Sequence, residues 1–175
     1  ADIVLVLDTS SSMAGDKVAR AVAAGKFFVS LLAADRDRVG LVAFSWEVRR
    51  FDLTGDLASI SRALDAVTTQ EGTRIDTALA ETLVVFQAGG RAGVARVAVL
   101  LTDGQPSAGT RDAALVQADR LRAEGVSLFT IGLGADADAA LLQDIADTPT
   151  HYYHAPTAVD LSAIYDRIAV RLPCR

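Results

Sequence analysis

The sequence predicts an α/β fold: a doubly wound, mostly parallel six-stranded sheet with one short antiparallel edge strand and helices on both faces. Two observations support this prediction. Apolar runs such as residues 3–7 contain no polar interruption, which is typical of strands buried on both faces. These runs alternate with amphipathic segments of helical length, and strands that alternate with helices form mostly parallel sheets.

The first part of the chain predicts a strand, a helix and a strand pair. After the run at 3–7, apolar residues recur at helical spacing over 17–32. Residues 38–44 are strongly apolar and predict a second strand. A short turn follows, and residues 48–53 are expected to return beside that strand as the antiparallel edge.

Two helices are predicted in the middle of the chain. Asp56 is a good N-cap residue for a helix that runs to about residue 67. After a loop, Thr73 is expected to open an amphipathic helix over 73–87, which Gly89 and Gly90 stop.

The remaining sequence continues the alternation without a repeat or a linker. Residues 94–102 are mostly apolar and predict a third long strand that ends at Asp103. Helices are then expected at 111–124, 138–146 and 160–171, and strands at 126–131 and 151–154.

Composition sets limits on the kind of protein. With 175 residues, 51% of them hydrophobic and 22% charged, residues 1–175 fit one globular domain with its own core. A net charge of −5 argues against a nucleic-acid partner. No apolar stretch approaches the ~20 residues that cross a bilayer, so we expect no direct membrane insertion.

Residue usage gives weaker indications about context. The chain starts at Ala1, directly before the first strand, so we expect a domain cut from a longer protein. Basic residues are almost all arginine, with only Lys17 and Lys26 as lysines, and this usage indicates a bacterial source. The single Cys174 cannot form an internal disulfide and is a candidate for a bond to a segment outside this sequence.

Oxygen-bearing side chains follow the ends of the predicted strands. Asp8, Ser10 and Ser12 follow the first strand, Asp103 ends the third long strand, and Thr73 lies after a turn. Ligands of open α/β sheets bind beyond the carboxyl ends of strands, where strand order reverses. Two carboxylates and three hydroxyls there suit octahedral Mg²⁺ or Mn²⁺ better than Ca²⁺.

These residues stand in a known pattern. The runs 8–13 (DTSSSM), 72–73 (GT) and 101–104 (LTDG) resemble the metal-ion-dependent adhesion site (MIDAS) of von Willebrand factor type A domains. The resemblance extends over essentially the whole chain and implies a Rossmann-like fold. It also implies that Ser10, Ser12 and Thr73 contribute hydroxyl oxygens to the metal, and that Asp8 and Asp103 act directly or through water.

The resemblance implies a binding module and not an enzyme. A metal ligated mainly by neutral groups keeps much of its charge and favours a carboxylate from an Asp or Glu of a partner protein. We therefore expect a metal-dependent adhesion or scaffolding module, monomeric as a fragment, with a cell-surface or secreted location slightly favoured. One departure is Arg74, which is expected to place a cation close to the metal face.

The strongest alternative is a Mg²⁺-dependent phosphohydrolase of the haloacid dehalogenase type with Asp8 as nucleophile. Such enzymes need a second Asp two residues later as general acid, and this position is Ser10. The turn after the first strand, residues 8–15, lacks the glycines of a dinucleotide-binding domain, and the phosphate-binding pattern Gly-x-x-x-x-Gly-Lys-Ser/Thr is absent. A structural domain with an inert site, and a zinc site at His151 and His154, are weaker alternatives.

Several nearby residues have an open role at this point. Trp46 either contacts a partner or packs over the strand pair, and Asp76 is either a solvated helix residue or a support for the site. Ser45 could hydrogen-bond near the site. Ser107 and Thr110 are expected to serve a turn and the next helix cap.

Overall fold

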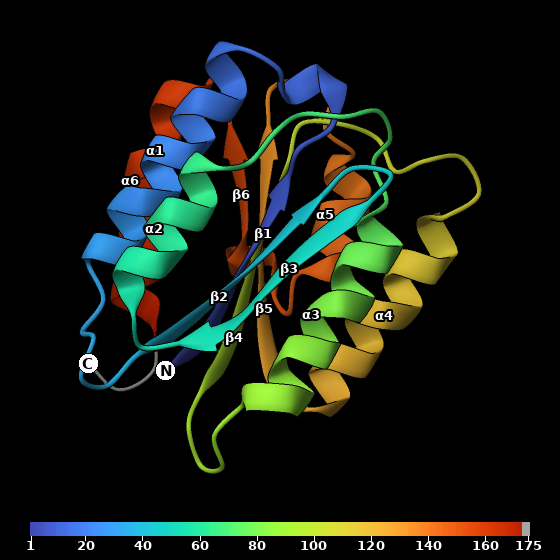
Figure 1. Cartoon of the computed structure of the whole chain (residues 1–175). Coiled ribbons are helices and arrows are strands. Elements are labelled where there is room, and N and C mark those ends of the chain that lie inside the picture. The colour runs from blue at the N-terminus through green and yellow to red at the C-terminus, as the bar shows by residue number, and fades with distance from the viewer. Residues whose placement is uncertain (173–175) are drawn as a thin grey trace.

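The computed structural model describes residues 1–172, and its strands form one six-stranded sheet in the order β3-β2-β1-β4-β5-β6 (Figure 1). The strands are β1 (Asp2–Asp8), β2 (Arg38–Phe44), β3 (Val48–Thr54), β4 (Arg96–Thr102), β5 (Val126–Leu133) and β6 (Tyr152–Ala155). All neighbours pair in parallel except β3, which runs antiparallel to β2 at one edge. The predicted fold class is therefore confirmed, including the antiparallel edge strand.

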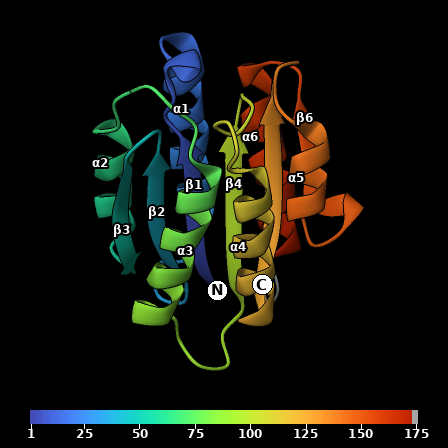
Figure 2. The same cartoon turned by 90° about the vertical axis from the view of Figure 1, so that its right-hand side faces the viewer.

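Within residues 1–172, six α-helices cover the two faces of this sheet. They are α1 (Asp16–Ser30), α2 (Leu57–Asp65), α3 (Ile75–Gly89), α4 (Arg111–Ala123), α5 (Ala139–Ile145) and α6 (Leu161–Arg171). Helices α1, α2 and α6 pack on one face, and α3, α4 and α5 pack on the other (Figures 1 and 2). The described part of the chain also contains the 3₁₀ turns η1 (Ser11–Met13), η2 (Pro149–His151) and η3 (Ala158–Asp160).

Strand β1 lies at the centre of the sheet and is buried along its whole length. Its side chains alternate between the two cores: Ile3, Leu5 and Leu7 face α1 and α6, whereas Val4 and Val6 face α3. Burial on both faces explains the uninterrupted apolar run, since a polar side chain on either face would lose its water without gaining a partner. Strand order reverses between β1 and β4, so the loops after these two strands are neighbours, as expected.

Some element boundaries differ from the prediction. Helix α3 begins at Ile75 and not at Thr73, which lies in the preceding loop. Strand β4 starts at Arg96 and not at residue 94. Strand β5 continues two residues past Ile131, and His151 lies in a 3₁₀ turn before β6.

The structure also bears on the helix cap predicted at Asp56. The Asp56 cap is confirmed, because its carboxylate accepts a hydrogen bond from the Ser59 backbone N–H. Cys174 lies outside the described residues. Within residues 1–172, no helix combines the length and the apolar character that crossing a membrane requires.

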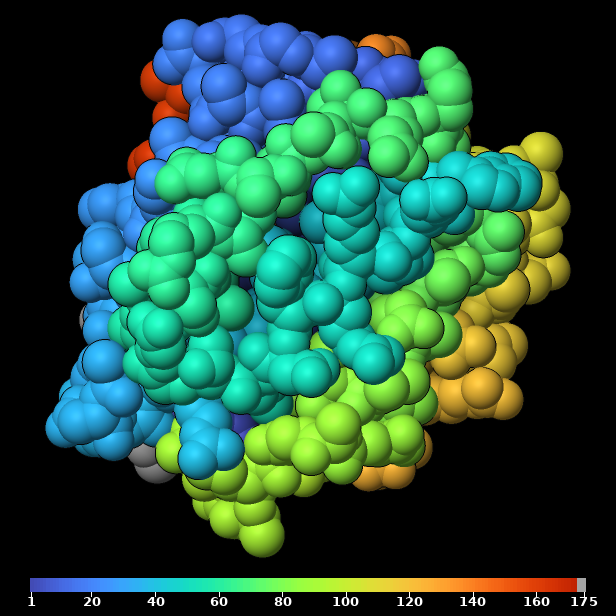
Figure 3. Space-filling model, viewed as in Figure 1, coloured from blue at the N-terminus to red at the C-terminus, as the bar shows by residue number. Residues whose placement is uncertain are grey.

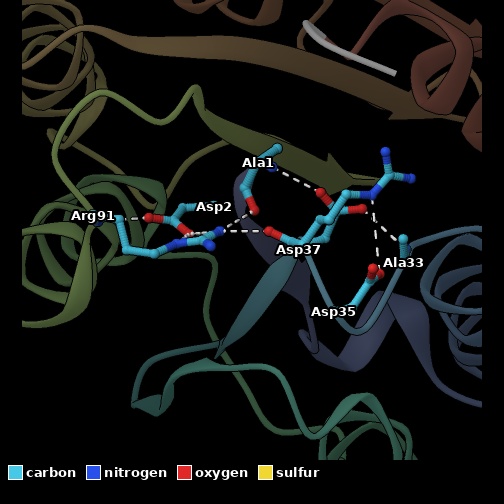
Figure 4. Close-up of polar contacts among 7 residues, drawn as sticks. Ala1, Asp2, Ala33, Asp35, Asp37 and Arg91 are labelled. Atoms are coloured by element: carbon cyan, nitrogen blue, oxygen red, sulfur yellow. Dashed lines mark hydrogen bonds and ion pairs between the residues drawn. The ribbon is translucent and has the colours of Figure 1, made fainter.

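An ion pair between the buried Asp2 and the half-buried Arg91 holds the end of the sheet opposite to the β1 carboxyl end (Figure 4). The Asp2 side chain is fully buried and accepts hydrogen bonds from Arg91 Nε at 2.8 Å and from the Arg91 backbone N–H at 2.7 Å. The Arg91 guanidinium also donates to the carbonyl oxygens of Ala1 and Arg36. Arg91 thereby joins the loop before β4, the start of β1 and the loop before β2.

We expect Arg91→Met to lower the free energy of unfolding by about 3 kcal/mol, because the buried Asp2 carboxylate would lose its charged partner. Urea denaturation measures this change. Arg120→Met is a matched control, since Arg120 is an exposed helical arginine for which we find no ion pair among the described residues. Equal, small losses for both variants would show that the Asp2–Arg91 pair does not stabilise the fold.

Candidate metal centre

The Asp8 carboxylate lies at the base of the candidate site, at the carboxyl end of β1. It is fully buried, and both oxygens are held: Oδ1 accepts from the Ser10 backbone N–H at 2.7 Å, and Oδ2 accepts from the Thr102 hydroxyl. Burial raises the pKa of Asp8 from 3.8 to about 6, although both hydrogen bonds oppose the shift. The hydrogen bonds of Asp8 therefore do not fully offset the cost of burying its negative charge. A nearby cation would stabilise the ionised carboxylate.

A chain of hydroxyl groups joins Asp8's loop to Asp103. The hydroxyls of Ser10 and Ser12 lie 3.0 Å apart, and the Ser12 hydroxyl donates to Asp103 Oδ1 at 2.7 Å. Asp103 is buried at the end of β4, whereas Ser12 is exposed on turn η1. The structure therefore brings together four of the five predicted ligands, with buried carboxylates below and an exposed hydroxyl above.

The second oxygen of Asp103 is paired with a cation from α1. The Lys17 ammonium lies 2.6 Å from Asp103 Oδ2, and the Asp103 side chain has 0% exposure while Lys17 has 42%. No role at this site was predicted for Lys17. Nothing in the spacing of residues 17 and 103 identifies the pair, because it depends on how α1 packs against the sheet.

Thr73, the fifth predicted ligand, lies on the adjacent loop and is held by its backbone. Its N–H donates to the Ser107 hydroxyl at 3.1 Å, and its C=O accepts from the Ser107 N–H at 2.9 Å. The expectation that Thr73 opens the helix is wrong, because Ser107 binds the backbone groups that a helical first turn would use. The expected turn is confirmed, because the Ser107 C=O accepts hydrogen bonds from the Thr110 N–H and hydroxyl. Ser107 also ties the loop after β4 to Thr73, which was not expected.

The Thr73 loop is also tied to the other loops of the site. The Gln70 N–H donates to the Thr9 C=O at 2.9 Å, so this loop lies directly beside the one that follows β1. On its other side, the Trp46 N–H donates to the Glu71 C=O, and the Arg74 N–H donates to the Ser45 C=O. Figure 3 shows the turn between β2 and β3 (cyan) next to this loop (green) at the upper end of the molecule.

Trp46 and Arg74 form a small platform beside Thr73. The Trp46 side chain is 64% exposed, and the Arg74 guanidinium lies 5.4 Å from its ring centroid. Arg74 also makes two hydrogen bonds to the Asp76 carboxylate, which holds the pKa of Asp76 below its usual value. Arg74 was expected to place a cation close to the metal face; in the structure, Asp76 compensates this charge.

The donor set fits a hard divalent cation. It contains two carboxylates and hydroxyl groups, and all of the donor atoms are oxygen, which suits Mg²⁺ or Mn²⁺. Among the described residues, no group of three or more His, Cys, Asp or Glu is placed to share a metal ion. His151 lies in η2, and its ring stacks on that of Phe129 with the centroids 3.9 Å apart. If a metal binds at this site, it must rely on hydroxyl ligands.

Comparison with known proteins identifies the family of this chain. The family model described as von Willebrand factor type A domain matches residues 2–167. The chain therefore belongs to the von Willebrand factor type A domain family.

The chain is similar to parts of larger proteins. It is 25% identical over 189 residues to the inter-alpha-trypsin inhibitor heavy chain H2 of Mus musculus, covering 98% of this chain and 20% of that protein. It is 32% identical over 165 residues to matrilin-1 of Mus musculus, covering 85% of this chain and 31% of that protein. The chain thus spans less than a third of the length of either relative.

A solved structure of a similar protein contains a metal ion. Proximal thread matrix protein 1 from the mussel byssus, with a zinc-occupied MIDAS motif, has a TM-score of 0.85 and 26% sequence identity. The match covers 96% of this chain and 44% of that chain. Divalent metal binding therefore occurs within this family.

The close approach of the loops at Gly72 is open to test. Gly72 has a φ of +89°, and a Cβ there would lie 3.0 Å from the backbone nitrogen of Trp46. We expect Gly72→Ala to destabilise the protein by about 2 kcal/mol and to weaken Mn²⁺ binding, because Thr73 moves with the loop. Urea denaturation and isothermal titration calorimetry measure the two effects.

Gly93→Ala is the matched control for this variant. Gly93 has a φ of +72°, with no atom within 4 Å of the added Cβ. Gly93→Ala places a Cβ at a positive φ, as Gly72→Ala does, but this Cβ meets no neighbouring atom and is not near the candidate metal site. We therefore expect this variant to bind Mn²⁺ as the parent does. Equal metal affinities for both variants would contradict the role of Gly72.

The buried Asp8 carboxylate predicts a pH dependence in EDTA-treated protein. Its folded pKa of about 6 exceeds the unfolded value of 3.8, so the folded state holds this proton more tightly. The contribution of Asp8 to stability is therefore greatest below pH 4 and is lost as pH rises through about 6, by up to about 3 kcal/mol.

Asp8→Asn removes this dependence, because the amide carries no charge at any of these pH values. We expect the variant to be more stable than the parent at pH 8 in EDTA, with the difference vanishing near pH 4. Urea denaturation from pH 4 to pH 8 measures it, with the exposed Asp166→Asn on α6 as control. A difference that does not change with pH would contradict the account of Asp8.

Proposed function

We propose that this domain is a metal-dependent protein-binding module that takes a carboxylate of a partner protein at a divalent cation. Mg²⁺ is the proposed ion, with Mn²⁺ also suitable and Ca²⁺ less so. The proposed metal site consists of Asp8, Ser10, Ser12, Thr73 and Asp103.

The observation that supports the proposal is the hydrogen-bonded cluster of Ser10, Ser12 and Asp103 above the buried Asp8. Since Ser12 donates its proton to Asp103, Ser10 is the donor of the hydrogen bond between the two hydroxyls. This arrangement leaves both lone pairs of the Ser10 oxygen and one of the Ser12 oxygen available for a cation. The two carboxylates lie below the surface, so an incoming ligand approaches from the side of the exposed hydroxyl. A cation in such a site is open to a further oxygen ligand from solvent or from a partner.

The burial of Asp8 argues against the alternative, a phosphohydrolase with Asp8 as nucleophile. The side chain has no exposed surface, and both of its oxygens accept hydrogen bonds. A substrate phosphorus would need to come within bonding distance of one of these atoms. Turnover of p-nitrophenyl phosphate with Mg²⁺ would support this alternative and contradict the binding module.

The wider context of the domain is part of the proposal. We propose that residues 1–175 form one domain of a longer, bacterial protein and that the fragment is monomeric. A cell-surface or secreted location is favoured, because the similar mussel protein is a matrix protein of a byssus thread. The negative net charge supports a protein partner and not a nucleic acid.

Paramagnetic broadening tests the proposed function directly. The probes are two capped peptides, Gly-Asp-Gly and Gly-Asn-Gly, observed by proton NMR with the domain and substoichiometric Mn²⁺. We expect selective broadening of the Asp peptide, since only its carboxylate reaches the ion. EDTA and Asp103→Ala should each abolish the effect.

Asp166→Ala is the control, because Asp166 is an exposed carboxylate on α6. This variant should broaden the Asp peptide as the parent does. Broadening that survives Asp103→Ala, or that is equal for the two peptides, would contradict the proposal.

A further inference from the structure

We propose that Lys17 sets the net charge of the metal centre: it weakens the binding of the cation itself and strengthens the attraction of the loaded centre for a carboxylate. This inference rests on the proposed function and adds a residue outside the five proposed ligands. It predicts opposite effects of one substitution on two binding steps.

Lys17 pairs with Asp103 from helix α1. Lys17 lies in the first turn of α1, and its ammonium nitrogen is 2.6 Å from Asp103 Oδ2. The other oxygen of Asp103 accepts the Ser12 hydroxyl. Because the Asp103 side chain has no exposed surface, water screens its charge little, and the ammonium is its closest counter-ion.

The formal charges of the centre show the consequence. Asp8 and Asp103 contribute −2 when both are ionised, and Lys17 contributes +1, so the centre carries −1 before a cation binds. A divalent ion then brings it to +1. Without Lys17 the same centre would attract the ion more strongly and would be neutral once loaded.

The other nearby cation does not have this effect. Arg74 donates two hydrogen bonds to Asp76, so the pair adds no net charge to the metal face. Lys17 differs because its partner is itself a proposed ligand of the metal. The ammonium and the metal ion therefore act on the same carboxylate.

A purely structural role for Lys17 predicts a different result. If Lys17 only positioned Asp103, its removal would weaken metal binding and, with it, binding of the carboxylate. If it sets the charge, its removal strengthens the first step and weakens the second. The sign of the change in metal affinity separates the two roles.

Calorimetry of Lys17→Met tests the inference, with Mn²⁺ alone as the first titrant. We expect Mn²⁺ to bind about tenfold more tightly than in the parent, the size expected for one unit charge at a partly exposed site. The second titrant is the capped Gly-Asp-Gly peptide, added to protein saturated with Mn²⁺. Its affinity should fall by about tenfold.

Two further variants make the result decisive. Lys26→Met is the matched control, because Lys26 is the only other lysine and pairs with Asp65 at 2.8 Å away from the site. It should behave as the parent in both titrations. Lys17→Arg keeps the charge, so both of its affinities should lie close to those of the parent. This expectation can be tested even if Lys17→Met does not fold.

The possible failures are distinguishable. Parent protein that binds neither Mn²⁺ nor the peptide overturns the proposed function and this inference together. Parent protein that binds both, with weaker or unchanged Mn²⁺ affinity in Lys17→Met, overturns only the role of Lys17.

Discussion

The structure depends on one constraint: a carboxylate is buried at the point where strand order reverses. Asp8 follows directly on the apolar β1, and the parallel register that places Leu7 opposite Leu101 brings Asp8 beside Thr102. Its hydrogen bonds to Thr102 and to the Ser10 N–H require β4 and the loop after β1 to hold fixed positions. The pairing of β1 with β4 therefore determines both the core and the geometry of the candidate site.

Backbone hydrogen bonds tie the loops around this carboxylate to one another. They join Thr9 to Gln70, Glu71 to Trp46, and Thr73 to Ser107. Because these bonds fix the loops relative to one another, binding need not spend free energy on ordering them. The Asp2–Arg91 pair at the other end of β1 fixes the position of the same central strand.

Much of the fold and of the candidate site could be predicted from the sequence, because the relevant signals are local. Uninterrupted apolar runs identify the strands, and Asp8 and Asp103 stand directly at strand ends. The start of α3 could not be predicted, since Ser107, far along the chain, holds the backbone of Thr73. The Lys17–Asp103 pair was missed for the same reason: it forms only when α1 packs against the sheet.

Anomalous diffraction from crystals soaked in Mn²⁺ tests the central claim most directly, because it locates the ion without reference to any activity. The account predicts one strong peak within coordination distance of the hydroxyl oxygens of Ser10, Ser12 and Thr73, with Lys17 still beside Asp103. A peak bound elsewhere, or no peak at this site at saturating Mn²⁺, would contradict the claim that these loops form a metal centre.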